Sequence, residues 1–244
     1  MRKKMIVGNW KMNGSFVKNK DLLENLISNL CKISCDIVIC PPSVYLSQVS
    51  ELVAGSNIKV GSQDVSKHHQ GAFTGEVSVN MLVDLGVGYC IVGHSERRIH
   101  HNEMDDDIAI KVNNLLDFGM VPIVCVGETY VERESGCCFD VISKQLIKIM
   151  AQNNKNINRL IIAYEPVWAI GTGLTATAIQ VQGMHEYIRN FLSKHTSHST
   201  DMKILYGGSL HSKNCAEILS QLDVDGGLVG GASLIADEFV SISS

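Results

Sequence analysis

One carboxylate, Glu165, stands where a buried strand would end. The run Leu160–Tyr164 is apolar and of strand length, and Pro166 follows the acid directly. The loop after it is apolar, contains glycine and carries Trp168, one of only two tryptophans in the chain. A strand end fixes an acid in place, and a hydrophobic loop that closes over it excludes water. The pattern indicates a general base, although a solvated surface glutamate would show the same local sequence.

Four further segments place polar groups or glycines where apolar strands would end. They are Asn9-Trp10-Lys11, Gly93-His94-Ser95-Glu96, Gly207-Gly208-Ser209 and Gly230-Gly231-Ala232-Ser233. The two glycine turns leave backbone N–H groups bare, and we expect each to open a helix, which suits a phosphate dianion. Lys11 favours the same ligand, and the imidazole can donate a hydrogen bond to a carbonyl. Singly these residues are more often structural, but together they predict proton abstraction next to the carbonyl of a small phosphorylated substrate.

Eight apolar segments, enriched in Ile and Val, alternate with segments of helical periodicity, as fully buried parallel strands do. The predicted strands are Met5–Asn9, Asp36–Cys40, Ile58–Gly61, Tyr89–Gly93, Val121–Val126, Leu160–Tyr164, Lys203–Tyr206 and Gly227–Val229. The intervening apolar faces are Leu22/Leu23/Leu26/Ile27/Leu30, Val141/Ile142/Leu146/Ile149 and Ile179/Val181/Met184/Ile188/Leu192. This alternation predicts one α/β domain over residues 1–244, a single closed (β/α)8 barrel with eight parallel strands. An open doubly wound sheet is the alternative, but its G-x-G-x-x-G opening is missing after the first strand.

Composition argues against several kinds of partner. The 21 basic and 25 acidic residues form no basic stripe, so nucleic acid is not expected. No apolar run approaches the length of a membrane span, and the basic start at Met1–Lys4 lacks the apolar segment of an export signal. The eight cysteines form no C-x-x-C pair, so we expect free thiols in a cytoplasmic protein. An exported or metal-binding protein is the alternative.

The histidines show no metal-ligand spacing. Those at 68/69 and 100/101 are adjacent pairs, whose side chains point in different directions. We interpret these four, together with His185, His195, His198 and His211, as surface or structural residues and expect no metal. A serine hydrolase is also not expected, because no G-x-S-x-G turn exists.

Five segments together resemble the triosephosphate isomerase family. They are Gly8–Gly14, Gly93–Arg98, Tyr164–Gly173, Tyr206–Ser209 and Leu228–Leu234, in the family's order and spacing over essentially the whole chain. The resemblance implies a TIM barrel that needs no cofactor. It would interconvert dihydroxyacetone phosphate and D-glyceraldehyde 3-phosphate through an enediolate, in glycolysis and gluconeogenesis and in connection with the pentose shunt.

The resemblance also implies a role for each site residue. Glu165 would move the proton, a neutral His94 would polarise the carbonyl, Lys11 would supply positive charge, and Glu96 would support them. Substrate would bind to Asn9 and Lys11 and to the N–H groups of Gly171, Ser209, Gly230 and Gly231. A lid would protect the enediolate, whose phosphate would otherwise be eliminated. The lid residues are Pro166, Val167, Trp168, Ala169, Ile170, Gly171, Thr172 and Gly173.

The segment Gln63–Val77 is too long and irregular to be a plain connector. It resembles the family's interdigitating loop, with Phe73, Thr74 and Glu76 near its tip, which docks beside Asn9 and Lys11 of a second subunit. The resemblance therefore implies a homodimer, and a disordered surface loop is the alternative. Leu174 and Asp64 stand where many members have Lys and Asn, which leaves details of lid opening and dimer contacts open.

Two rival functions remain. Another phosphosugar isomerase or epimerase could use the same fold, but such epimerases would want metal-ligating His and Asp at strand ends, which the chain lacks apart from His94. A barrel kept only for binding or adhesion should have lost one of Lys11, His94 or Glu165, and all three are present.

Overall fold

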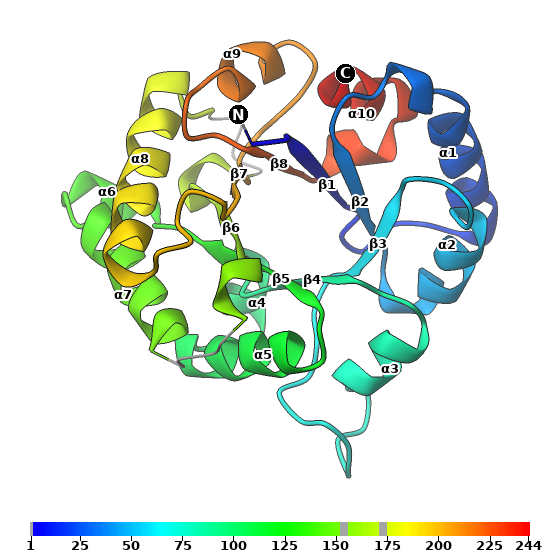
Figure 1. Cartoon of the computed structure of the whole chain (residues 1–244), viewed down its shortest axis with the longest axis horizontal. Coiled ribbons are helices and arrows are strands. Elements are labelled where there is room, and N and C mark those ends of the chain that lie inside the picture. Colours follow the sequence, from blue (N-terminus) through cyan, green and yellow to red (C-terminus); the bar gives the residue numbers. More distant parts are fainter. Residues whose placement is uncertain (1, 152–155, 171–174) are drawn as a thin grey trace.

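A closed ring of eight parallel strands surrounded by helices forms the protein (Figure 1). The computed structural model describes residues 2–151, 156–170 and 175–244. The strands are β1 (Met5–Asn9), β2 (Asp36–Cys40), β3 (Lys59–Ser62), β4 (Tyr89–Val92), β5 (Val121–Val126), β6 (Ile161–Tyr164), β7 (Ile204–Tyr206) and β8 (Gly226–Val229). Each strand pairs with its neighbours in the sequence, and β8 closes the ring on β1 with Gly226 opposite Met5. The predicted (β/α)8 barrel is confirmed.

Helices follow the strands on the outside of the ring (Figure 1). They are α1 (Phe16–Ser28), α2 (Leu46–Leu52), α3 (Val79–Asp84), α4 (Ser95–His100), α5 (Asp105–Asp117), α6 (Tyr130–Glu134), α7 (Cys138–Met150), α8 (Ala178–His195), α9 (Cys215–Leu219) and α10 (Ala236–Ser243). The longest, α8, begins with a capping box in which Thr177 and Gln180 each bind the other's backbone N–H. No helix in the described ranges combines the length and the apolar character needed to cross a membrane.

Every strand end that differs from its predicted position differs by one residue. The fourth strand ends at Val92, before the predicted Gly93, because Gly93 has a φ of +70° and leaves the extended conformation. Along α8, Ile179 was predicted to share an apolar face with Val181. This prediction was wrong, because Ile179 is 84% exposed. Ile179 lies two positions before the buried Val181, which places the two side chains on opposite faces of a helix.

Two layers of apolar side chains form the core, because successive residues of a strand point to opposite faces. Val7 belongs to the cluster that fills the barrel, whereas Ile6 packs in the layer between strands and helices. All eight cysteines are free thiols, and those on β2, β4 and β5 are buried. Burial raises the pKa of the Cys40 thiol, so this side chain acts as a small apolar residue.

The segment between β3 and α3 projects away from the ring as a folded loop (Figure 1). A hydrogen bond from Ser66 N to Val77 O, 2.8 Å long, closes its base. Near the tip the ring of Phe73 stacks on His68 with centroids 3.7 Å apart, yet Phe73 remains 42% exposed. The loop therefore presents an aromatic side chain far from the barrel core.

Candidate active site

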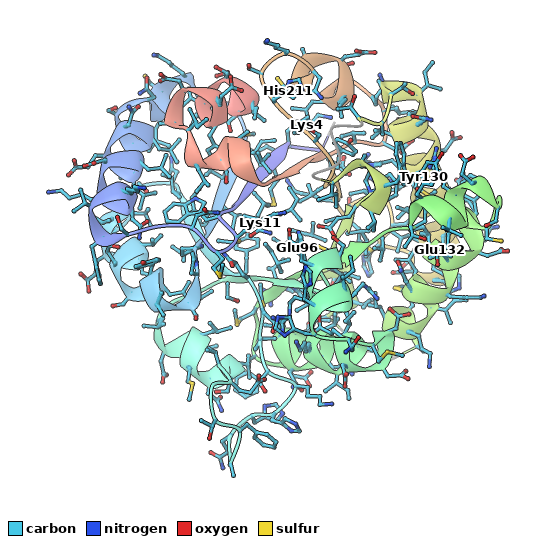
Figure 2. All side chains as sticks on the ribbon, turned by 180° about the vertical axis from the view of Figure 1, so that it is seen from behind. Lys4, Lys11, Glu96, Tyr130, Glu132 and His211 are labelled. Carbon is cyan, nitrogen blue, oxygen red and sulfur yellow. The ribbon has the colours of Figure 1, made fainter. Side chains whose placement is uncertain are left out.

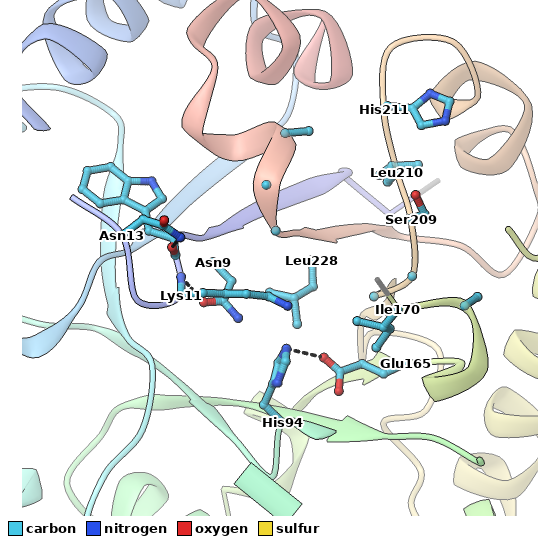
Figure 3. A pocket seen from close by; sticks show the side chains of 17 residues that line it. Asn9, Lys11, Asn13, His94, Glu165, Ile170, Ser209, Leu210, His211 and Leu228 are labelled. Atoms are coloured by element: carbon cyan, nitrogen blue, oxygen red, sulfur yellow. Dashed lines mark hydrogen bonds and ion pairs between the residues drawn. The ribbon is translucent and has the colours of Figure 1, made fainter. Parts of the chain in front are cut away.

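A cavity of about 380 Å³ lies at the carboxyl ends of the strands. Its lining brings together most of the residues singled out in the sequence: Asn9, Lys11, His94, Glu165, Ala169, Ile170, Ser209, Gly230 and Gly231. They come from segments far apart in the chain, and the barrel joins them because parallel strands all end on the same side. Figure 3 shows the side chains of His94 and Glu165 pointing toward each other, with Lys11 opposite them.

The carboxylate of Glu165 lies directly after β6 and is 2% exposed. Its Oε2 accepts a hydrogen bond from Ser95 N, 3.0 Å away, at the first turn of α4. Its Oε1 is buried and has no hydrogen-bond partner among the described residues. Behind it, burial and then the charge of Glu165 raise the pKa of the Cys125 thiol, so this neighbour stays neutral. Glu165 thus offers one anchored and one unsatisfied oxygen.

His94 caps α4 with its imidazole. Its Nδ1 accepts the N–H of Glu96 at 3.2 Å, which places the hydrogen of a neutral imidazole on Nε2. That Nε2 lies 3.1 Å from Glu165 Oε1, although the N–H direction leaves this oxygen without a hydrogen bond. A neutral imidazole with its N–H directed into the cavity can donate to a substrate carbonyl.

Lys11 reaches across the cavity from the end of β1. Its φ of +52° is rare for a residue with a side chain. The strained turn is stabilised by a hydrogen bond from the backbone N–H of Lys11 to Asn9 Oδ1, 3.0 Å away. Its Nζ forms a short ion pair with Glu96, and Figure 2 shows the two side chains next to each other. Burial opposes ionisation of Glu96, but the hydrogen bond from Lys11 and the proximity of His94 outweigh it and lower its pKa.

Both glycine turns contribute to the lining of the cavity. No hydrogen bond to another described residue engages the N–H groups of Ser209, Gly230 or Gly231. Gly230 lies against Lys11, because a Cβ there would fall 3.3 Å from Lys11 Cε. Free amides beside an ammonium group can bind a phosphate dianion.

Part of the prediction for these turns was wrong. Gly207 N is not bare, since it donates to Tyr164 O at 2.7 Å. The turn at Gly207–Ser209 also does not open a helix, because α9 begins only at Cys215. In between, the side chain of Asn214 donates to Ser209 O and accepts from His211 N, which closes a separate turn. Gly230 does cap a short 3-10 turn at Gly231–Leu234, as expected.

The predicted lid is described as far as Ile170; Gly171, Thr172, Gly173 and the departure Leu174 lie outside the described residues. Val167–Ala169 form one 3-10 turn after Pro166. The indole N–H of Trp168 donates to Glu128 Oε1 at 2.8 Å, and the Arg133 guanidinium lies 4.9 Å over the indole ring.

Sequence reasoning missed several residues that hold this site. Glu128 is fully buried and its Oε1 also accepts from Tyr164 at 3.0 Å and from Arg133 at 2.9 Å. The Gln63 side-chain amide donates to Lys11 O at 2.9 Å. His211 also lines the cavity, besides the residues expected there. The only signal was their position just after strands or near a motif.

The departure Asp64 lies outside the cavity lining, in a cluster of charges. It pairs with Lys111 at 2.7 Å and with Arg97 at 2.8 Å, and the buried Glu103 lies beside the same two cations. Burial raises the pKa of the Asp64 carboxyl, and the charges of the two cations oppose that shift.

Comparison with known proteins shows the family of the chain. The family model for triosephosphate isomerase matches residues 4–244. Proteins named triosephosphate isomerase from Albidiferax ferrireducens and Delftia acidovorans are each 49% identical to the chain, over 99% of it and 98% of their own length. The protein of that name from Cupriavidus necator is 45% identical over the whole of both chains. Because the family model covers residues 4–244 and these relatives match over nearly their full length, the chain belongs to the triosephosphate isomerase family.

Proposed function

We propose that the chain isomerises dihydroxyacetone phosphate and D-glyceraldehyde 3-phosphate by moving one proton between neighbouring carbons. The observation that carries the proposal is the 3.1 Å approach of Glu165 Oε1, which has no hydrogen bond to another described residue, to the Nε2 of His94 in one cavity of about 380 Å³. Removing a proton next to a carbonyl needs a base and a hydrogen-bond donor for the developing oxyanion. The reaction needs no cofactor.

In the proposed mechanism Glu165 takes the proton from the carbon beside the carbonyl and returns it to the other carbon. Ser95 N anchors one oxygen of this carboxylate, and the other, Oε1, lies 3.1 Å from His94 Nε2 beside the cavity that both residues line. His94 donates from Nε2 to the carbonyl oxygen and shuttles the hydroxyl protons of the enediolate. Its Nδ1 stays on Glu96 N, which keeps the imidazole in one tautomer.

The phosphate would bind to the N–H groups of Ser209, Gly230 and Gly231, with Gly171 as a further donor. Lys11 would neutralise the dianion, and Asn9 would orient the substrate from the end of β1. Glu96 would hold the ammonium group of Lys11 through their ion pair, and its carboxylate also lies 3.7 Å from His94 Nδ1. The lid Pro166–Gly173 would close over the enediolate and prevent elimination of its phosphate.

A coupled assay tests the proposal. The purified full-length chain is mixed with D-glyceraldehyde 3-phosphate, and formation of dihydroxyacetone phosphate is followed through a second enzyme that consumes it. We expect turnover with this substrate and none with the unphosphorylated triose, because the glycine turns would lack their anion. No turnover at saturating substrate would refute the proposed reaction.

The second part of the proposal is a homodimer that acts in the cytoplasm. The projecting loop Gln63–Val77 carries the exposed Phe73, and a second cavity of about 390 Å³ opens beside Lys11 and the 96%-exposed Met12. A second copy could place its loop there and cover both apolar side chains. The partner loop would then complete the wall outside Asn9 and Lys11.

Replacing Phe73–Glu76 with a short glycine linker should produce monomers in sedimentation and lower the activity per subunit. The substitution Leu222→Ser is the control, because Leu222 is 82% exposed but far from the loop in sequence and outside both cavities. A fully active, monodisperse monomer of the unaltered chain would rule out the dimer.

A further inference from the structure

One buried side chain, Gln145 on α7, binds the loop between β5 and α6 through two hydrogen bonds to Gly127. Its Oε1 accepts the N–H of Gly127 at 3.0 Å, and its Nε2 donates to the carbonyl of the same Gly127 at 3.1 Å. Gln145 is 8% exposed and does not line the active-site cavity. A carboxamide carries a donor and an acceptor in one plane, so a single side chain fixes both peptide planes at Gly127.

Gly127 lies in close contact with the backbone of Glu165. A Cβ at position 127 would fall 1.8 Å from Glu165 O, so the two backbones approach as near as glycine allows. The residue before it, Val126, accepts a hydrogen bond from Glu165 N at 2.8 Å. The position of Glu165 along the axis of strand β6 therefore depends on where Val126 and Gly127 lie.

The residue after Gly127 holds the start of the lid. The carbonyl of Glu128 accepts from Val167 N at 3.1 Å, and its Oε1 accepts from the indole of Trp168 at 2.8 Å. A displacement of Gly127 would thus move two things together, the base and the first turn of the lid.

We infer that Gln145 is a positioning residue for the isomerisation, acting through Gly127 on Glu165 and on the lid residues Val167 and Trp168. The inference rests on the proposed function and deepens it, because it assigns the alignment of base and lid to a side chain outside the cavity. Misplacing a base by about 1 Å can cost on the order of a hundredfold in rate. The loss should fall on kcat rather than on substrate affinity, since Gln145 touches none of the phosphate-binding turns.

A matched control exists at the other end of the barrel. Gln182 on α8 also makes two hydrogen bonds to one residue, with Asp223 N at 3.1 Å and Asp223 Oδ2 at 2.7 Å. Asp223 lies in the loop that enters β8, away from the cavity. Gln145→Met and Gln182→Met each keep the side-chain length and remove two hydrogen bonds.

The experiment compares the two variants of the full chain by urea unfolding and by steady-state kinetics with D-glyceraldehyde 3-phosphate. We expect both to lose stability, but only Gln145→Met to lose kcat, by roughly ten- to a hundredfold with KM changed less than about threefold. Release of inorganic phosphate per isomerisation should rise in Gln145→Met alone, because a displaced lid leaves the enediolate exposed. A purely structural role would not change this ratio.

If Gln145→Met does not fold, Gln145→Glu and Gln182→Glu replace the pair, since each keeps an acceptor for the backbone N–H. Equal kcat values and equal phosphate release in the matched variants would overturn the inference while leaving the proposed function intact. An unaltered chain without isomerase activity would instead refute the proposed function.

Discussion

The two ends of the barrel are built in opposite ways. At the amino ends of the strands, the buried Asp225 accepts from Arg2 at 2.6 Å, from Arg189 at 2.5 Å and from Ile204 N at 2.9 Å. Its own carbonyl accepts from Met5 N at 2.9 Å. One acid thereby ties together the beginnings of β7, β8 and β1, and both of its carboxylate oxygens are satisfied.

The carboxyl ends leave comparable groups unsatisfied. Glu165 keeps a buried oxygen without a hydrogen bond in the described structure, and Lys11 adopts a strained φ of +52°. Such groups cost stability, and here both residues line the cavity in which the proposed substrate would bind. Stability and chemistry therefore depend on opposite ends of the same strands, and we expect substitutions at one end to leave the property of the other end unchanged.

The substitution Asp225→Ala should break the amino end alone. Removing one partner of a buried ion pair leaves the guanidinium groups uncompensated, which typically costs about 3–5 kcal/mol of unfolding free energy. We expect this loss in urea unfolding, with kcat per folded molecule unchanged at a temperature below the transition. Asp201→Ala, at an exposed position, is the control and should change neither quantity. A fall in kcat for the folded Asp225→Ala protein would show that the two ends are coupled.

Glu165→Asp should break the carboxyl end alone. It withdraws the carboxylate by one methylene, and a displacement of about 1 Å is worth on the order of a hundredfold in rate. Steady-state turnover should fall by at least that factor, while the unfolding free energy changes little. Glu186→Asp, on the exposed side of α8, provides the same chemical change away from the cavity. Near-normal turnover in Glu165→Asp would remove Glu165 as the base.

The sequence predicts the barrel well because its signals are local. An apolar run such as Val121–Val126 is bounded by turn residues within a few positions, and its predicted and observed limits are the same. The motif residues also follow directly from the rule that polar groups at strand ends meet at one face. Asn9, His94 and Glu165 could therefore be expected to lie together before any contact was known.

The supporting contacts could not be predicted, because they join residues far apart in the chain. Glu128 and Trp168 are 40 positions apart, and Gln145 lies 18 positions from the Gly127 it holds. The helical periodicity of α7 does not distinguish Gln145 from the other polar residues of that helix. The helix expected after Gly207–Ser209 failed for a different, local reason. The side chain of Asn214 binds backbone groups only three and five positions away and closes a turn that no dipeptide signal predicts.

The amino end also contains a buried titrating group, His185, whose Nδ1 lies 3.2 Å from Asp223 O in the loop that enters β8. Burial lowers its pKa from 6.5 to about 4, and the nearby Arg189 acts in the same direction, while the Asp223 carbonyl and the charges of Asp225 and Asp223 oppose the shift. Between these two pH values the unfolded chain binds the proton and the folded chain does not. The stabilisation is therefore complete above the unfolded pKa and is lost as pH falls toward the folded one.

This linkage predicts that His185 alone lowers the unfolding free energy by about 2 kcal/mol between roughly pH 7 and pH 5. Urea unfolding of the unaltered chain and of His185→Gln is measured at both pH values. Gln carries no titrating proton, and the contributions of the other titrating groups cancel when the two proteins are compared. The remaining difference is the contribution of His185 to the change in unfolding free energy with pH. We expect the variant to be less stable at neutral pH but to lose about 2 kcal/mol less on acidification. Parallel pH profiles for the two proteins would contradict the assignment. His195→Gln, at an exposed position on the same helix, should follow the unaltered chain. If kcat of folded His185→Gln stays unchanged at neutral pH, then a titrating group at the amino end changes the stability of the protein without changing catalysis by Glu165.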